Sequence, residues 1–175
     1  EHARGVYYIQ AGRLFSPARV REIPSVGAIV AFETAQRRRE NDYLPPYLSL
    51  DLPSADIVGA GCLAGQAAPM AIATTGELPF VVPENERETF QRRRSFLKQI
   101  DSNGVFDKRH QQGLFAEIEQ QYRLADPLLN NRAAAPVFQL DAKQRERYGK
   151  CGVGDACLLA RNVIQADAGT RFILI

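Results

Sequence analysis

The sequence predicts an α/β fold that is rich in helix and has few, short strands. At the C-terminal end, a helical pattern over residues 155–168 is followed by Gly169 and then by the apolar, β-prone run Thr170–Ile175. A helix, a glycine and a near-continuous apolar strand make half of an α/β unit. Tyr47–Leu50 is a second short apolar run with strand character. Because so few other strands are available for pairing, we expect the remaining strands of the sheet to lie outside these 175 residues.

The length and composition fit one globular domain with a sizeable core. The chain has 175 residues, of which 45% are hydrophobic and 24% are charged. Its net charge of +2 gives no overall field that would attract a nucleic acid or a membrane surface. No apolar run approaches the roughly 20 residues that span a bilayer. We therefore expect no nucleic-acid partner and no membrane span.

Two helices are expected before the first strand. The first covers residues 4–13 and ends at Gly12, since glycine is a common helix stop. Ser25 suits the N-cap of the second helix. In this second helix, apolar residues recur at helical spacing, namely Val26, Ile29, Val30 and Phe32. Arg37–Arg39 would lie in its last turn, where positive charge suits the helix dipole.

The region between the two strands predicts three further helices, over residues 85–102, 106–122 and 142–148. Asn85, with Glu88 three residues later, resembles a capping box at the start of the first of them. The second is expected to close before Pro127. Residues 53–69 form a glycine-containing loop, and residues 78–82 suggest either one more short strand or an extended segment.

The cysteines and most charged motifs have simple structural interpretations. An odd count of three cysteines without regular spacing is no disulfide framework, and we expect buried thiols. The arginine triplets at 37–39 and 92–94 are interpreted as solvated helix faces, and His110 as a core histidine. Residues 151–154, Cys-Gly-Val-Gly, precede a helix; they are either a turn with a helix start, which we favour, or a set of N–H donors for an anion.

The candidate catalytic residues are His2 and Arg4. Together with Arg13 they crowd one short helix that ends in glycine, and imidazole and guanidinium groups are the side chains that bind oxyanions. The alternative interpretation of residues 2–13 is an amphipathic helix that frays at its start. Residue chemistry alone leaves both interpretations open.

Five short segments in fixed order carry a family resemblance. Residues 2–13 contain His-Ala-Arg-Gly-Val-Tyr, 23–30 contain Ile-Pro-Ser-Val-Gly and 44–48 contain Leu-Pro-Pro-Tyr. Residues 61–70 run from Gly-Cys-Leu to Ala-Pro-Met, and 147–172 contain Arg-Tyr-Gly, Cys-Leu-Leu-Ala-Arg and Thr-Arg-Phe. This series resembles the DUF1501 family of the alkaline phosphatase and sulfatase superfamily.

The resemblance implies a fold and an activity. It implies an alkaline phosphatase-like α/β/α sandwich, with residues 1–175 as a single partial domain from its central segment. The implied activity is metal-dependent hydrolysis of a small phosphate or sulfate ester. The divalent metal, Zn, Ca or Mg, would be held by Asp and His residues near the two ends of the full domain. The chain's partner would be the rest of its own polypeptide, and the family suggests export to the periplasm.

The chain departs from the pattern of that superfamily at two positions. His2 falls near the place of the sulfatase nucleophile, where a Cys, Ser or Thr is expected, and Ala11 replaces a threonine. These departures keep an alternative open, in which the protein is a non-catalytic member of the same fold that binds a ligand or a partner. The metal ligands are not identified by the sequence.

Overall fold

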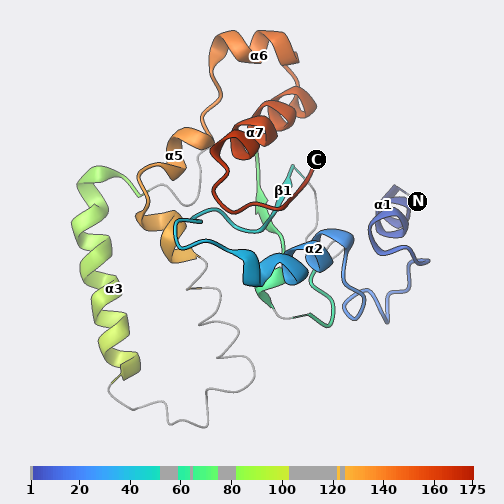
Figure 1. Ribbon diagram of the computed structural model, residues 1–175, viewed down its shortest axis with the longest axis horizontal. Helices are drawn as coiled ribbons and strands as arrows, with labels where there is room; N and C mark the ends of the chain where they lie inside the picture. Colours follow the sequence, from blue (N-terminus) through green and yellow to red (C-terminus); the bar gives the residue numbers. More distant parts are fainter. Residues whose placement is uncertain (1, 52–58, 64, 75–81, 103–121, 123–124) are drawn as a thin grey trace.

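A computed structural model of the chain describes residues 2–51, 59–63, 65–74, 82–102, 122 and 125–175 (Figure 1). The described part mixes helices with one small parallel sheet, which confirms the α/β prediction. Its three strands are β1 (Tyr47–Leu50), β2 (Met70–Ile72) and β3 (Phe172–Leu174). They lie in the order β2-β1-β3, and both pairings are parallel.

The central strand is buried on both faces, which explains why it is apolar except for Ser49. Leu48 and Leu50 belong to the larger core cluster, with side chains from α5 (Ala134–Val137) and α7 (Gly152–Ala166). Tyr47 points to the opposite face and packs with Ala28 of α2 (Val26–Thr34). The sheet is therefore covered by α7 on one face and by α2 on the other (Figure 1).

The remaining elements lie around this centre. They are α1 (His2–Ala11), η1 (Ala35–Arg37), η2 (Gly65–Ala67), η3 (Glu84–Glu86), α3 (Arg87–Ser102) and α6 (Ala142–Tyr148). The predicted helices near residues 4–13, 85–102 and 142–148 are thus confirmed. No helix in the described ranges combines the length and the apolar character that a membrane span requires.

The inner face of α2 consists of small residues. A Cβ atom on Gly27 would lie 2.5 Å from Cζ of Tyr47 and 2.6 Å from Cδ1 of Phe172, so only glycine allows this approach. Ala28 and Ala31 are buried beside it. Ser25 caps the helix as expected, because its Oγ accepts from the Ala28 amide at 3.3 Å. The large apolar residues that define the helical pattern point outward instead, and Val26, Ile29 and Phe32 are each more than 40% exposed.

The first arginine triplet does not form a solvated helix face, contrary to the prediction. The helix ends at Thr34, and the partly buried Arg38 donates from Nη2 to the carbonyl oxygens of Asp42 and Leu44, both at 3.0 Å. Arg39 donates from Nε to Oδ1 of Asp42 at 3.0 Å and from Nη1 to Oδ2 of Asp167 at 2.9 Å. These bonds join the chain entering β1 to the chain between α7 and β3. Burial lowers the pKa of Arg38.

The two ends of the last helix, α7, differ from the prediction. The last helix starts at Gly152, three residues earlier than expected, and its C-cap is Asp167 in the left-handed region (φ 41°). Gly169, also at positive φ (110°), lies in the turn that follows. Residues 125–130 are helical and include Pro127, and most of the helix expected before them lies outside the described residues, so its stop before Pro127 stays a prediction.

Other predictions failed or lie outside the described residues. Strand β2 was not predicted, because three residues after Pro69 give no recognisable period. Cys62 and Cys151 are exposed and Cys157 is partly buried, so the expectation of three buried thiols is wrong. Most of the expected strand at 78–82 and of the helix at 106–122, with His110, lies outside the described residues.

Candidate functional site

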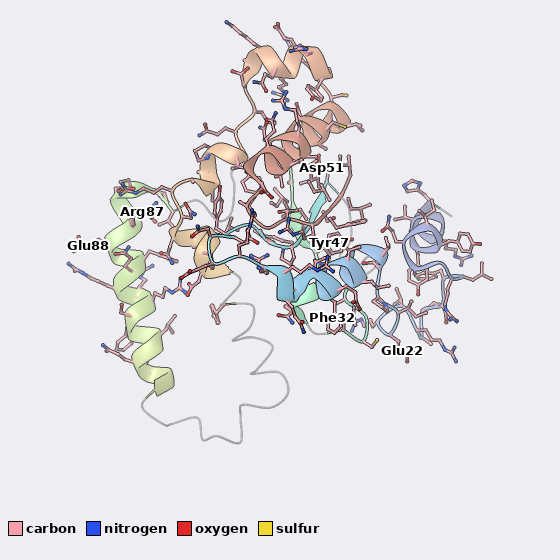
Figure 2. All side chains as sticks on the ribbon, in the orientation of Figure 1. Glu22, Phe32, Tyr47, Asp51, Arg87 and Glu88 are labelled. Atoms are coloured by element: carbon pink, nitrogen blue, oxygen red, sulfur yellow. The ribbon has the colours of Figure 1, made fainter. Side chains whose placement is uncertain are left out.

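The carboxyl ends of the three parallel strands meet at one edge of the sheet. In open α/β sheets this edge is where ligands bind. Asp51 follows β1 directly, and Thr74 follows β2 after one intervening residue. Figure 2 shows Asp51 at this edge, close to α7. This edge of the sheet is therefore the candidate ligand-binding site.

Asp51 is held in an unusual backbone conformation. Its φ of 54° lies in the left-handed region, which non-glycine residues seldom occupy, although Asp tolerates it better than most. Its amide donates to the Ile72 carbonyl at 3.0 Å. The Thr74 amide donates to Oδ1 of Asp51 at 2.7 Å, and the Thr74 hydroxyl donates to Oδ2. Two strand ends thus fix the direction of one exposed carboxylate.

The Asp51 carboxylate faces the first turn of α7. Its Oδ2 lies 3.9 Å from the position that a Cβ on Gly152 would take. The first N–H groups of a helix have no partner within the helix, and the helix dipole makes this end positive. The site therefore combines a negative side chain with a group of backbone donors that attract anions.

A buried ion pair fixes the start of α7 against α6. Asp155 is 1% exposed, and both of its carboxylate oxygens accept from Arg145, with Nε 2.6 Å from Oδ1. Hydrogen bonding to Asp155 raises the pKa of Arg145. Gly154 is buried against the carbonyls of Tyr148 and Gly149. The donor end of α7 is thus positioned by α6 and by the turn between the two helices.

Replacing Asp155 with alanine is expected to destabilise the fold by about 2 kcal/mol, because bonds to a charged group each contribute about 1.5–3 kcal/mol and the exposed Arg145 regains water. Urea unfolding followed by circular dichroism measures this loss. Glu146→Ala, which removes a 68% exposed carboxylate from the same region, is the control and should change the unfolding free energy by less than about 0.5 kcal/mol. Equal effects of the two substitutions would contradict a structural role for Asp155.

The residues proposed from the sequence lie elsewhere. His2 and Arg4 are exposed on α1, and neither forms a hydrogen bond or ion pair with another described residue. The buried residue of α1 is Tyr7, whose ring meets Phe15 edge-on at 5.4 Å. Within the described ranges, no hydrogen bond or ion pair joins α1 to Asp51. Asp51 itself was missed, although its signal was present: a lone aspartate directly after a buried strand.

The described residues do not form a complete metal site by themselves. No group of three or more His, Cys, Asp or Glu side chains suitable for a metal lies within the described ranges. Asp51 and the hydroxyl of Thr74 supply oxygen ligands of the kind that Mg²⁺ and Ca²⁺ prefer. Any metal bound there would need further ligands from other residues.

Comparison with protein-family models, with curated proteins and with solved structures finds no match to this chain. The geometry of the site and the segment resemblance are therefore the grounds for a functional proposal.

Proposed function

We propose that this chain forms part of a metal-dependent ester hydrolase that acts on a phosphate or sulfate monoester, on an alkaline phosphatase-like fold. One observation carries the proposal: the Asp51 carboxylate is fixed at the carboxyl edge of the sheet, facing the N-terminus of α7. A bound oxyanion would use the N–H groups of α7 but would repel Asp51. A divalent cation between the oxyanion and the Asp51 carboxylate would offset their repulsion, because it would bind both negative groups.

In this proposal each group has a limited role. Asp51 is one ligand of the cation, and Thr74 orients it through its amide and hydroxyl. The first turn of α7 donates to the oxygens of the ester. The cation would supply Lewis acidity. The remaining ligands and the nucleophile come from residues outside the described ones, in accord with a family in which they lie near the ends of the domain.

His2 and Arg4 remain candidates through the family resemblance. Both side chains are exposed on α1, so they are accessible to an ester. The proposal depends on Asp51 more than on these two residues, since Asp51 has the fixed geometry.

Metal-dependent hydrolysis of p-nitrophenyl phosphate or p-nitrophenyl sulfate by the full-length protein tests this function. We expect turnover with added Zn²⁺, Ca²⁺ or Mg²⁺, and a loss of about 100-fold or more in kcat/KM for Asp51→Asn, because a metal contributes several kcal/mol to charge stabilisation. Glu146→Gln, which changes an exposed carboxylate of α6 that forms no contact with Asp51, is the matched control and should retain activity. Full activity of Asp51→Asn would remove Asp51 from the proposal.

A non-catalytic binding protein is the second candidate function. It is favoured by His2, which stands near the position where the superfamily has its nucleophile. This candidate expects no turnover of either ester, together with a rise in melting temperature on adding metal and inorganic phosphate. Turnover that His2→Ala abolishes would exclude it.

A further inference from the structure

A groove of about 590 Å³ runs along the outer side of α7, away from the carboxyl edge of the sheet. One wall is the chain that links α5 to α6, and the other is the C-terminal half of α7. Its volume lies within the usual range of about 300–1,000 Å³ for ligand pockets. The proposed hydrolase function does not use this groove, which is separate from the Asp51 site.

The groove is rich in side-chain amides around one arginine. Gln139, Gln144, Asn162 and Gln165 line it together with Arg161. Partly buried Val137 and Leu140, which pack on the main core, form its apolar part. Amides both donate and accept hydrogen bonds, as does a peptide backbone. Among the described residues no aromatic side chain lines the groove, so they offer no ring on which a nucleobase could stack.

Arg161 is held in place, yet its hydrogen bonding is incomplete. Its Nη2 donates to Oε1 of Gln144 and, at 3.2 Å, to Oδ1 of Asn162. The guanidinium carbon lies 5.5 Å from the centre of the Tyr148 ring, a cation–π contact. Its Nη1 forms no hydrogen bond with a described residue, its Nε is buried without one, and no described carboxylate lies within ion-pair distance of the guanidinium.

A guanidinium that is fixed at the wall of a groove, with Nη1 not hydrogen-bonded to a described residue and no carboxylate beside it, can take an anionic acceptor from outside. A carboxylate satisfies both the charge and the planar fork of an arginine. Gln139 and Gln165 line the same groove, and their amides can pair with the backbone of an extended chain that carries this carboxylate.

We propose that this groove binds an extended peptide segment that carries one acidic side chain, with Arg161 as the anchor for its carboxylate. The apolar part takes a neighbouring aliphatic side chain, and the amides pair with the peptide backbone. Asp141 at the groove end disfavours a second acidic residue on that side. This binding site is independent of the hydrolase function.

Fluorescence anisotropy with a labelled peptide, Gly-Ala-Leu-Glu-Ala-Leu-Gly with an amidated C-terminus, tests the proposal on the full chain. Saturable binding is expected, and the same peptide with Gln in place of Glu should bind about 10-fold more weakly or worse, since a charged hydrogen bond contributes about 1.5–3 kcal/mol. Equal affinity for the two peptides would overturn the role of the carboxylate. Absence of binding at millimolar peptide would overturn the proposal as a whole.

Variants of the groove provide the second arm of the test. Arg161→Gln is expected to remove the preference for the Glu peptide, whereas Arg147→Gln, at an exposed arginine of α6, should leave it unchanged. Because Arg161→Gln also removes packing on Tyr148, the exposed Gln165→Glu serves as a variant that leaves those contacts in place. Its new carboxylate should weaken binding of the Glu peptide selectively, and an unchanged affinity would contradict the assignment.

Free glutarate separates the two possible sources of a carboxylate. Glutarate at the peptide's own concentration should not displace the peptide, because it lacks the backbone that the amides bind. Displacement at equal concentration would overturn the peptide part of the proposal and assign the groove to small dicarboxylates.

Discussion

Replacing Gly154 with alanine is expected to lower the free energy of unfolding by about 3 kcal/mol, the upper part of the usual range for overpacking a tight contact. A Cβ at this position would lie 2.3 Å from the Gly149 carbonyl oxygen and 2.5 Å from that of Tyr148. Both atoms belong to the backbone, so neither can move away by changing a rotamer. The turn between α6 and α7 must open instead.

Gly152, two residues earlier in the same helical turn, is the matched control. A Cβ there meets nothing closer than Oδ2 of Asp51, at 3.9 Å. Gly152→Ala should therefore be neutral or stabilise by up to about 0.5–1 kcal/mol, because alanine loses less backbone freedom in a helix. Urea unfolding of the two variants measures the difference. Similar stabilities would show that the turn yields easily and does not position α7.

The comparison of these glycines also separates folding from function. The Gly152 variant adds a methyl group beside Asp51 without disturbing the turn. If the carboxyl edge binds an oxyanion as proposed, Gly152→Ala should weaken that binding while the protein remains stable. Gly154→Ala should act through stability.

The sequence predicted β1, β3 and most of the helices because the residues that specify each of these elements lie within the element itself or directly beside it. Tyr47–Leu50 is apolar except for Ser49 and is buried at every position, which suits a central strand with helices above and below. Ser25 identified the start of α2 through its capping hydroxyl. These signals need no knowledge of distant parts of the chain.

Predictions from the sequence were wrong where the packing of a residue depends on distant residues that lie against it in the fold. In α2 the large residues Ile29 and Phe32 suggest the buried face, but the ring of Tyr47 fills the space beneath the helix and leaves room for small residues alone. Arg38 and Arg39 follow the helix and bind backbone and carboxylate groups of residues more than a hundred positions away as well as nearby ones. No local pattern specifies such partners.

The candidate site shows the same division. That an aspartate follows a buried strand is visible in the sequence, and its place at the carboxyl edge follows from the strand. Its contact with Thr74 depends on β2, a strand too short to be recognised beforehand. Its closeness to α7 depends on the fold of the C-terminal half.

Asp42→Asn is expected to destabilise the fold by about 2–3 kcal/mol at neutral pH, since it removes the charged partner of a hydrogen-bonded cluster. The Asp42 side chain is 1% exposed and accepts from the Arg39 amide and from Nε of Arg39, both at 3.0 Å. An asparagine would present an NH₂ group to one of these donors. The guanidinium of Arg171, 3.7 Å away, would also lose one of its two carboxylate partners and keep Asp167.

The difference in unfolding free energy between the wild type and Asp42→Asn should become smaller as the pH falls. Burial opposes ionisation of Asp42, but hydrogen bonds from Arg39 and the charges of Arg39 and Arg38 outweigh it and hold the pKa of this carboxyl below its usual value. A group with a lowered folded-state pKa stabilises the fold above its unfolded pKa of about 4, and this stability is lost as the pH falls through the folded pKa. The wild-type protein should thus weaken below about pH 4, and the two proteins should become more alike there.

Urea unfolding from pH 7 down to the acid limit of the fold measures both curves. Asp167, whose pKa is also lowered by its bond to Arg39, remains in the variant and should leave a smaller residual dependence in the same direction. Glu88→Gln is the control, because Glu88 is 78% exposed in a surface pair with Arg92 and its loss should leave the pH profile nearly that of the wild type. If the Asp42→Asn curve runs parallel to the wild-type curve down to the lowest pH, the ionised carboxylate of Asp42 does not join the two chain segments that enter β1 and β3.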